Sequence, residues 1–157
     1  MSSSVTVAEV FRAVGLKPHG PVRWGKPVVE AAPGVYLVSL TPNPTAKHRY
    51  LNVDYLSSEE QERWLPGEPV LYIGRTSRKL CMRLCEFYCH EYGDSSPHRG
   101  GQAIKLLRGC PLWVFWAGTE RFLDDEREMI AFFKDRMGSL PFANRKRGSR
   151  SRKRPRP

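Results

Sequence analysis

The chain has 157 residues, of which 40% are hydrophobic and 27% are charged, and its formal net charge is +10. This length suits one domain with a hydrophobic core, and the composition is that of a globular protein rather than a disordered or fibrous one. No stretch is long and apolar enough to span a bilayer, and the N-terminus lacks the basic and apolar regions of a secretory signal, which argues against a membrane partner.

The N-terminal residues 1–33 predict one helix followed by a loop. Thr6 and Glu9 have the spacing of a capping box, in which each side chain bonds the backbone of the other residue. Apolar residues then repeat with a helical period and end at a glycine: Val7, Val10, Phe11, Val14 and Gly15. Residues 17–33 are rich in Pro and Gly, and we expect this loop to pack with the helix on the domain that follows.

Two apolar runs, at 34–40 and 69–74, predict strands that are separated by an insertion at 41–68. The insertion is long for a hairpin connection, so it should hold structure of its own. Ser57 and Glu60 have the spacing of a helix start, and Pro66-Gly67 would stop that helix.

The second half of the chain alternates helices with one more strand. Ser77 is placed to cap a helix that reaches Tyr92, and a loop at 94–101 and a short helix at 102–107 follow. The aromatic run 110–118 predicts a third strand, and a last helix spans 123–137. One small sheet with helices packed on it is an α+β domain.

Residues 145–157 form a strongly basic tail. They hold 8 basic and no acidic residues, which leaves 18 of the 26 basic residues against all 16 acidic ones in the preceding part. Such a segment cannot bury apolar surface, and we expect it to be disordered and to attract phosphate backbones without reading sequence. A role in solubility or localisation is the alternative.

The four cysteines predict small buried side chains in a reducing compartment. Three of them recur every fourth residue in a helical pattern, and the set is Cys81, Cys85, Cys89 and Cys110. Because a helix rises about 1.5 Å per residue, the outer two of the first three would lie about 12 Å apart and could not share one zinc ion. A two-cysteine zinc site completed by His90 or His98 is the alternative.

Two tyrosine triplets, Gly34-Val35-Tyr36 and Tyr72-Ile73-Gly74, lie in the first two predicted strands. Arg83, Glu128 and Asn144 follow them in order. Together these residues resemble the signature of the GIY-YIG nucleases, enzymes that hydrolyse phosphodiester bonds at a tyrosine-rich site with one metal ion. The resemblance implies a three-stranded, mostly antiparallel sheet flanked by helices, with the nuclease domain at 34–144.

The resemblance assigns a role to each matching residue. Glu128, within DEREMIAFF, would bind one Mg²⁺ or Mn²⁺ ion, both of which prefer oxygen ligands. Tyr36 would accept a proton from the attacking water, while Tyr72 and Arg83 orient the scissile phosphate and neutralise its charge. Asn144 would fix the site by hydrogen bonding.

The general base is the open part of this assignment. Tyrosine has an ordinary pKa of about 10 and needs a nearby metal ion or cation to accept a proton near neutral pH. Family members place a histidine or tyrosine four residues after the arginine, where this chain has Phe87, or a histidine before the short helix, where it has His98. Tyr88, His90 or His98 could substitute, or no such group is needed.

Each residue taken singly also has a purely structural reading. The tyrosines could be half-buried strand residues, Glu128 could cap a helix with Asp125, Arg83 could lie on the surface, and Asn144 could belong to a turn. The ordered conjunction, rather than any single residue, indicates a nuclease.

We therefore expect a metal-dependent endonuclease, restriction-like or of the repair type, that is cytoplasmic or associated with the nucleoid. DNA is the expected partner, and RNA is the alternative because nothing in the sequence reads the 2′-hydroxyl. A non-catalytic nucleic-acid-binding module with the same fold is the alternative function. The insertion at 41–68 is a candidate for reading sequence in a groove. The residues expected to contact nucleic acid are Arg75, Arg99, Arg145, Lys146 and Arg147.

Overall fold

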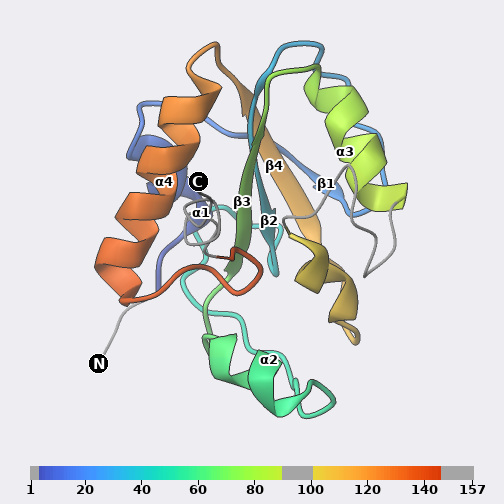
Figure 1. Ribbon diagram of the computed structural model, residues 1–157, viewed down its shortest axis with the longest axis vertical. Coiled ribbons are helices and arrows are strands. Elements are labelled where there is room, and N and C mark those ends of the chain that lie inside the picture. Colours follow the sequence, from blue (N-terminus) through green and yellow to red (C-terminus); the bar gives the residue numbers. More distant parts are fainter. Residues whose placement is uncertain (1–3, 90–100, 146–157) are drawn as a thin grey trace, which may run out of the picture.

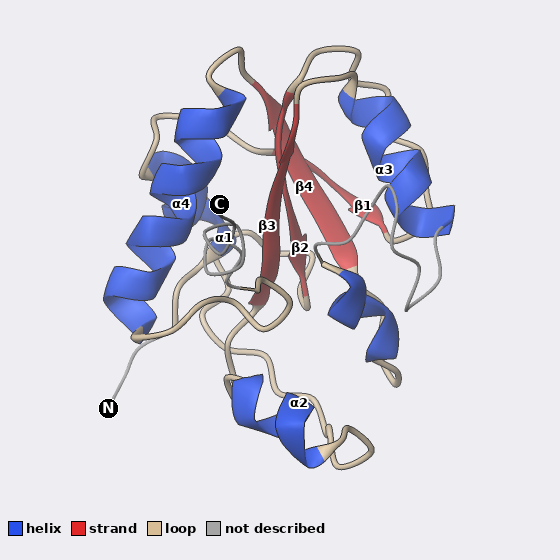
Figure 2. Cartoon of the chain, viewed as in Figure 1, coloured by secondary structure: helices blue, strands red, loops and turns tan. Residues whose placement is uncertain are grey.

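A four-stranded antiparallel sheet, with strand order β1-β4-β2-β3, forms the centre of the computed structural model, which describes residues 4–89 and 101–145 (Figures 1 and 2). The predicted α+β class is confirmed, but the prediction of three strands is wrong by one. The strands are β1 (His19–Arg23), β2 (Gly34–Ser39), β3 (Val70–Thr76) and β4 (Trp113–Gly118).

The additional strand, β1, lies in the segment that was predicted to be a loop because of its Pro and Gly content. It pairs only with β4, so it forms one edge of the sheet, where Pro and Gly are tolerated. Gly20 has φ +101°, and a Cβ at this position would lie 2.8 Å from the carbonyl oxygen of Val114. The glycine therefore permits a close approach between the two strands that a side chain would prevent.

Helices cover both faces of the sheet. Helices α1 (Val7–Arg12) and α4 (Phe122–Met137) pack on one face, while α3 (Leu80–Cys89) packs on the other, as Figure 1 shows. The insertion carries α2 (Ser58–Arg63), and the short 3-10 helix η1 (Gln102–Leu106) precedes β4. The predicted capping box at Thr6 and Glu9 is confirmed, as is the cap of α2 by Ser57. The predicted end of α3 at Tyr92 lies outside the described residues.

Alternation along the strands divides the core into two clusters. Val35, Leu37 and Ile73 point to the face that α1 and α4 cover, together with Phe115 of β4. The neighbouring residues of the same strands point to the α3 side. Because β2 is central and buried along its whole length, the tyrosine that it carries lies deep in the second cluster.

The other edge of the sheet, β3, is covered by the segment that follows α4. Ala143 donates a backbone hydrogen bond to the Leu71 carbonyl, and the side chain of Asn144 bonds both backbone groups of Ile73 at 3.0 Å. The amide thus takes the place of a strand partner for one residue of β3. None of the helices in the described ranges has the length and apolar character needed to cross a membrane.

Candidate active site

The two triplet tyrosines lie side by side on the α3 face of the sheet. In the pairing of β2 with β3, Tyr36 stands opposite Gly74 and Tyr72 opposite Val38, so the tyrosines are diagonal neighbours. Their ring centroids are 6.1 Å apart. Tyr36 is 1% exposed and Tyr72 is 7% exposed, which makes them core residues rather than half-buried strand residues.

Arg83 reaches this tyrosine pair from α3. Its guanidinium hydrogen-bonds the hydroxyl of Tyr36, and its terminal nitrogen lies 3.6 Å from the carboxylate of Glu86. The side chain is 21% exposed, and its Nε is buried without a hydrogen-bond partner among the described residues. A buried N–H that no protein group satisfies costs free energy, unless a ligand or water accepts its hydrogen bond.

Burial raises the pKa of Tyr36 well above its usual value, and the neighbouring Tyr72 adds to the rise. The positive charge and the hydrogen bond of Arg83 oppose this effect, and Glu126 adds a further, smaller increase. The net direction is upward, so Tyr36 is a neutral phenol near neutral pH. In this environment its hydroxyl is suited to donate a hydrogen bond rather than to accept a proton.

Glu126, rather than Glu128, is the carboxylate of α4 whose charge acts on Tyr36. Glu126 is 12% exposed and accepts a hydrogen bond from Nε of Arg75 at 3.2 Å. In β3, Arg75 comes directly after Gly74, and Gly74 is the residue that pairs with Tyr36. The ion pair therefore connects α4 to the same edge of the sheet that carries the tyrosine triplet.

Glu128 lies on the outer side of α4, away from this group. Its side chain is 58% exposed and approaches Arg121 at 3.8 Å. The helical period explains the difference, because Glu126 lies three residues before the buried Met129 and seven before the buried Phe133. Glu128 is two positions from Glu126, which turns it to the opposite side of the helix. The sequence carried this signal in the apolar stripe of α4, whereas the motif match alone pointed to Glu128.

An aromatic wall completes the site. Phe87 of α3 lies 6.1 Å from the Tyr36 ring and 5.6 Å from the Tyr72 ring, so the position four residues after Arg83 is apolar and buried here. Nζ of Lys105 lies 5.7 Å from the centroid of the Phe87 ring. Gly101 has φ +82°, and a Cβ on it would meet the Tyr72 ring at 2.8 Å. The sequence did not single out Lys105 or Gly101.

The remaining predicted residues divide into two groups. Asn144 bonds the backbone of Ile73 between the two residues Tyr72 and Gly74, so it holds the triplet strand rather than facing the tyrosines. Arg145, expected to contact nucleic acid, donates to Glu60 at 2.9 Å and to the Phe142 carbonyl. The other predicted site residues lie outside the described residues: His90, His98, Arg99, Lys146 and Arg147, with the rest of the tail.

The side chains available as ligands limit the kind of metal ion that this site could hold. Within residues 4–89 and 101–145, no group of three or more His, Cys, Asp or Glu side chains gathers where it could hold a metal ion. Glu126, which pairs with Arg75 and whose charge acts on Tyr36, is a single carboxylate, and it fits an ion such as Mg²⁺ that completes its coordination with waters and substrate phosphate. A fully protein-bound metal centre does not fit these residues.

The prediction that the cysteines are buried is wrong. Cys85 and Cys89 are exposed, and Cys81 and Cys110 are partly exposed. In α3 the buried stripe is formed by Leu80, Leu84 and Phe87. Two of the thiols follow a buried residue by one position, which rotates them about 100° around the helix and out of the core.

Comparison of the chain with protein-family models, with curated proteins and with solved structures found no match in any of the three. The chemistry of the site therefore has to be argued from its own geometry.

Proposed function

We propose that this protein is a phosphodiester-hydrolysing endonuclease of the GIY-YIG type. The observation that carries the proposal is the convergence of Tyr36, Tyr72 and Arg83, which come from three elements, with Glu126 acting on the same tyrosine. Phenol hydroxyls and a guanidinium with an unsatisfied N–H can donate hydrogen bonds to a phosphate, and a carboxylate can hold a metal ion.

In this proposal Arg83 binds the scissile phosphate. A guanidinium presents several N–H donors in a fixed plane that matches the oxygens of a phosphate group. The side chain of Arg83 is 21% exposed, and its Nε has no acceptor within the described part of the chain, so the guanidinium retains donor capacity for a phosphate. Contact with Tyr36 orients the guanidinium, and the charge that develops in the transition state strengthens its interaction with the phosphate.

Tyr36 and Tyr72 position the reacting groups through their hydroxyls. Because its pKa is raised, Tyr36 remains protonated and donates its O–H, in contrast to the role of proton acceptor that the resemblance implies. Glu126 would hold the metal ion, with Arg75 fixing the carboxylate. A bound Mg²⁺ or Mn²⁺ ion would supply charge stabilisation and an activated water.

DNA is the proposed substrate, with RNA as the alternative, in either a restriction-like or a repair-type role. The tail at 145–157 supports a polyanionic partner, since its basic residues have no acidic neighbours in sequence. It would add affinity that falls as salt rises.

The test uses two glutamates of the same helix as a matched pair. Supercoiled plasmid is incubated with the wild type in Mg²⁺ or Mn²⁺, and relaxation or linearisation is followed on a gel. We expect Glu126→Ala and Arg83→Ala to lower the cleavage rate by about a hundredfold or more, while Glu128→Ala cleaves like the wild type. If Glu126→Ala retains full activity, or if Glu128→Ala alone loses it, the proposed site is wrong.

A non-catalytic nucleic-acid-binding module is the second candidate, and two observations favour it. Glu126 is already paired with Arg75, and Phe87, which cannot transfer protons, occupies the position where GIY-YIG nucleases carry a histidine or tyrosine. Such a module would bind plasmid without cutting it in either metal. Its affinity would fall with salt concentration and would not change in Glu126→Ala.

A further inference from the structure

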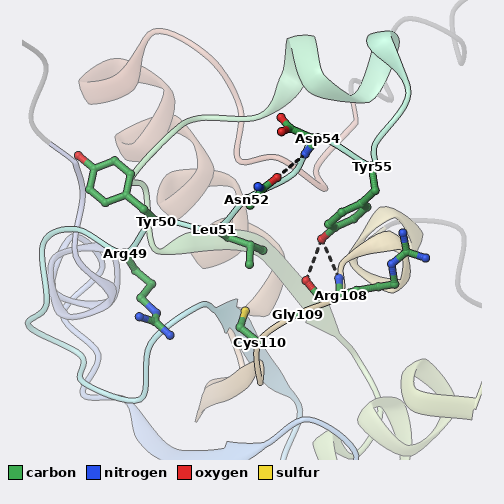
Figure 3. Close-up of a pocket in the computed structure, with 9 residues that line it drawn as sticks. All are labelled: Arg49, Tyr50, Leu51, Asn52, Asp54, Tyr55, Arg108, Gly109 and Cys110. Carbon is green, nitrogen blue, oxygen red and sulfur yellow. Dashed lines mark hydrogen bonds between the residues drawn. The ribbon is translucent and has the colours of Figure 1, made fainter.

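An open groove of about 660 Å³ lies between the insertion and the segment that leads into β4. One wall is formed by residues 49–55 of the insertion, and the other by Arg108, Gly109 and Cys110. Figure 3 shows Leu51 of the first wall facing Cys110 of the second. Leu51 packs against Gly109, where a Cβ would lie 3.8 Å from it. The groove shares no lining residue with the tyrosine site.

Tyr55 joins the two walls, so hydrogen bonds hold the groove in shape. Its hydroxyl donates to the carbonyl of Arg108 at 2.9 Å and accepts from the backbone N–H of the same residue at 2.8 Å, as drawn in Figure 3. The guanidinium of Arg108 then lies over the Tyr55 ring at 4.4 Å. A guanidinium that is stacked on an aromatic ring loses less conformational freedom when it binds an anion.

The groove carries more positive than negative charge. Arg49 and Arg108 line it together with one acidic residue, Asp54. Across the described ranges, neither arginine makes an ion pair with a carboxylate, in contrast to Arg75 and Arg145. Two exposed guanidiniums without carboxylate partners leave their donors available to an anionic ligand.

Tyr50 adds an aromatic surface at the same groove. One side of its ring lies against the backbone of Gly67, where a Cβ would come within 2.8 Å of Cζ. The residue is nevertheless 69% exposed, the most exposed aromatic side chain in the part of the chain that the structure describes. His48 stacks nearby, with a centroid distance of 6.2 Å. A ring that is held by Gly67 and His48 and still largely exposed is suited to stack with a nucleobase.

We propose that this groove binds an unpaired stretch of nucleic acid, with phosphates on Arg49 and Arg108 and a base on Tyr50. The inference rests on the proposed function, which supplies a nucleic-acid substrate. The groove would hold a single-stranded part of that substrate at a second point while the tyrosine site acts on another. Stacking and phosphate binding do not require a particular base, so the preference is for single strands rather than for a sequence.

Binding is measured with the full-length protein in EDTA, so that no cleavage occurs, using fluorescent single-stranded and duplex oligonucleotides of the same sequence. We expect Tyr50→Ala to weaken single-strand binding by about tenfold, while Tyr50→Phe, which keeps the ring, binds like the wild type. Arg49→Ala with Arg108→Ala should reduce the slope of log K against log salt by about 1.4. Arg127→Ala with Lys134→Ala removes the same charge from exposed positions of α4 and is the control.

The outcomes separate this inference from the proposed nuclease activity. If the groove variants bind both oligonucleotides as tightly as the wild type, the groove does not bind nucleic acid, whatever the plasmid assay shows. If the double variant of the groove and the double variant of α4 lose affinity equally, the effect is one of net charge and the inference is also overturned. Selective loss of single-strand binding in a protein that does not cut plasmid would support the groove and reject the nuclease.

Discussion

The ring of Tyr36 lies across Gly74 of the neighbouring strand, so closely that a Cβ at position 74 would stand 2.6 Å from Cζ of the tyrosine. The two residues are direct partners in the β2–β3 register. Gly74 of β3 therefore leaves the space that the ring of Tyr36 on β2 occupies. Since Gly74 needs no unusual φ angle, the requirement is one of space rather than of backbone conformation.

Replacing Gly74 with Ala should move the Tyr36 ring away from Arg83. We expect a loss of about 1–3 kcal/mol in the free energy of unfolding and a reduced cleavage rate, because the methyl group overpacks a filled core. Denaturant unfolding and the plasmid assay measure the two effects. Gly118→Ala on β4 is the milder comparison and should cost less, since its nearest atom, Cβ of Ala32, is 3.1 Å from the added methyl group and needs to shift only slightly. Full activity in a folded Gly74→Ala would show that the ring position does not matter.

Asn144→Ala should weaken the covered edge of β3. The substitution removes both hydrogen bonds to the backbone of Ile73 and leaves a part-buried N–H and carbonyl without partners. We expect a loss of about 1–3 kcal/mol in the free energy of unfolding. The side chain of Asn43 also makes two hydrogen bonds, both as an acceptor and at an exposed site, and Asn43→Ala should cost less than about 0.5 kcal/mol. Equal effects of the two substitutions in denaturant unfolding would contradict a structural role for Asn144 at this edge.

The sequence predicts those parts of the fold that depend on local interactions. The capping box of Thr6 and Glu9 involves residues three apart, and the structure contains both of its hydrogen bonds. Strand β1 has no comparable local signal, because it is held by pairing with β4 from the far end of the chain. Its Gly and Pro residues indicate a loop until the partner strand is known.

In the candidate site, too, some features are predictable from the sequence and others depend on distant parts of the chain. Tyr36, Tyr72 and Arg83 follow one another in an ordered motif, and the structure brings them together. The choice between Glu126 and Glu128 depends on which side of α4 faces the sheet. The buried positions Met129 and Phe133 would have fixed that side. The groove at Tyr50 was beyond prediction in its detail, since it forms only when the insertion meets the segment before β4.

Tyr36→Phe should lower the cleavage rate without moving the acid limb of the pH–rate profile. Burial raises the pKa of Tyr36, so the residue carries its proton throughout the neutral range and does not titrate there. Loss of the hydroxyl removes a hydrogen-bond donor, and we expect a decrease of about tenfold to a thousandfold. The measurement is kcat/KM against pH for both proteins. If Tyr36 were the general base, the acid limb would change or vanish in the variant.

Glu68 is expected to make the stability of the fold depend on pH. Its carboxylate is 1% exposed and accepts hydrogen bonds from the backbone N–H groups of Val5 at 2.7 Å and Val70 at 2.9 Å. It thereby joins the segment before α1 to the start of β3. Burial raises the pKa of Glu68 to about 7, although the two hydrogen bonds act in the opposite direction.

A raised carboxyl pKa means that the native state binds the proton more tightly than the unfolded chain does. The resulting stabilisation is complete below the unfolded pKa of 4.5 and is lost as pH rises through about 7. We expect it to amount to at most about 3 kcal/mol. Urea unfolding of the wild type and Glu68→Gln at several pH values between 5 and 9 measures this. Because Gln resembles the protonated carboxyl, the stability of the wild type relative to Glu68→Gln should fall as pH rises, and a constant difference would show that Glu68 does not titrate in this range.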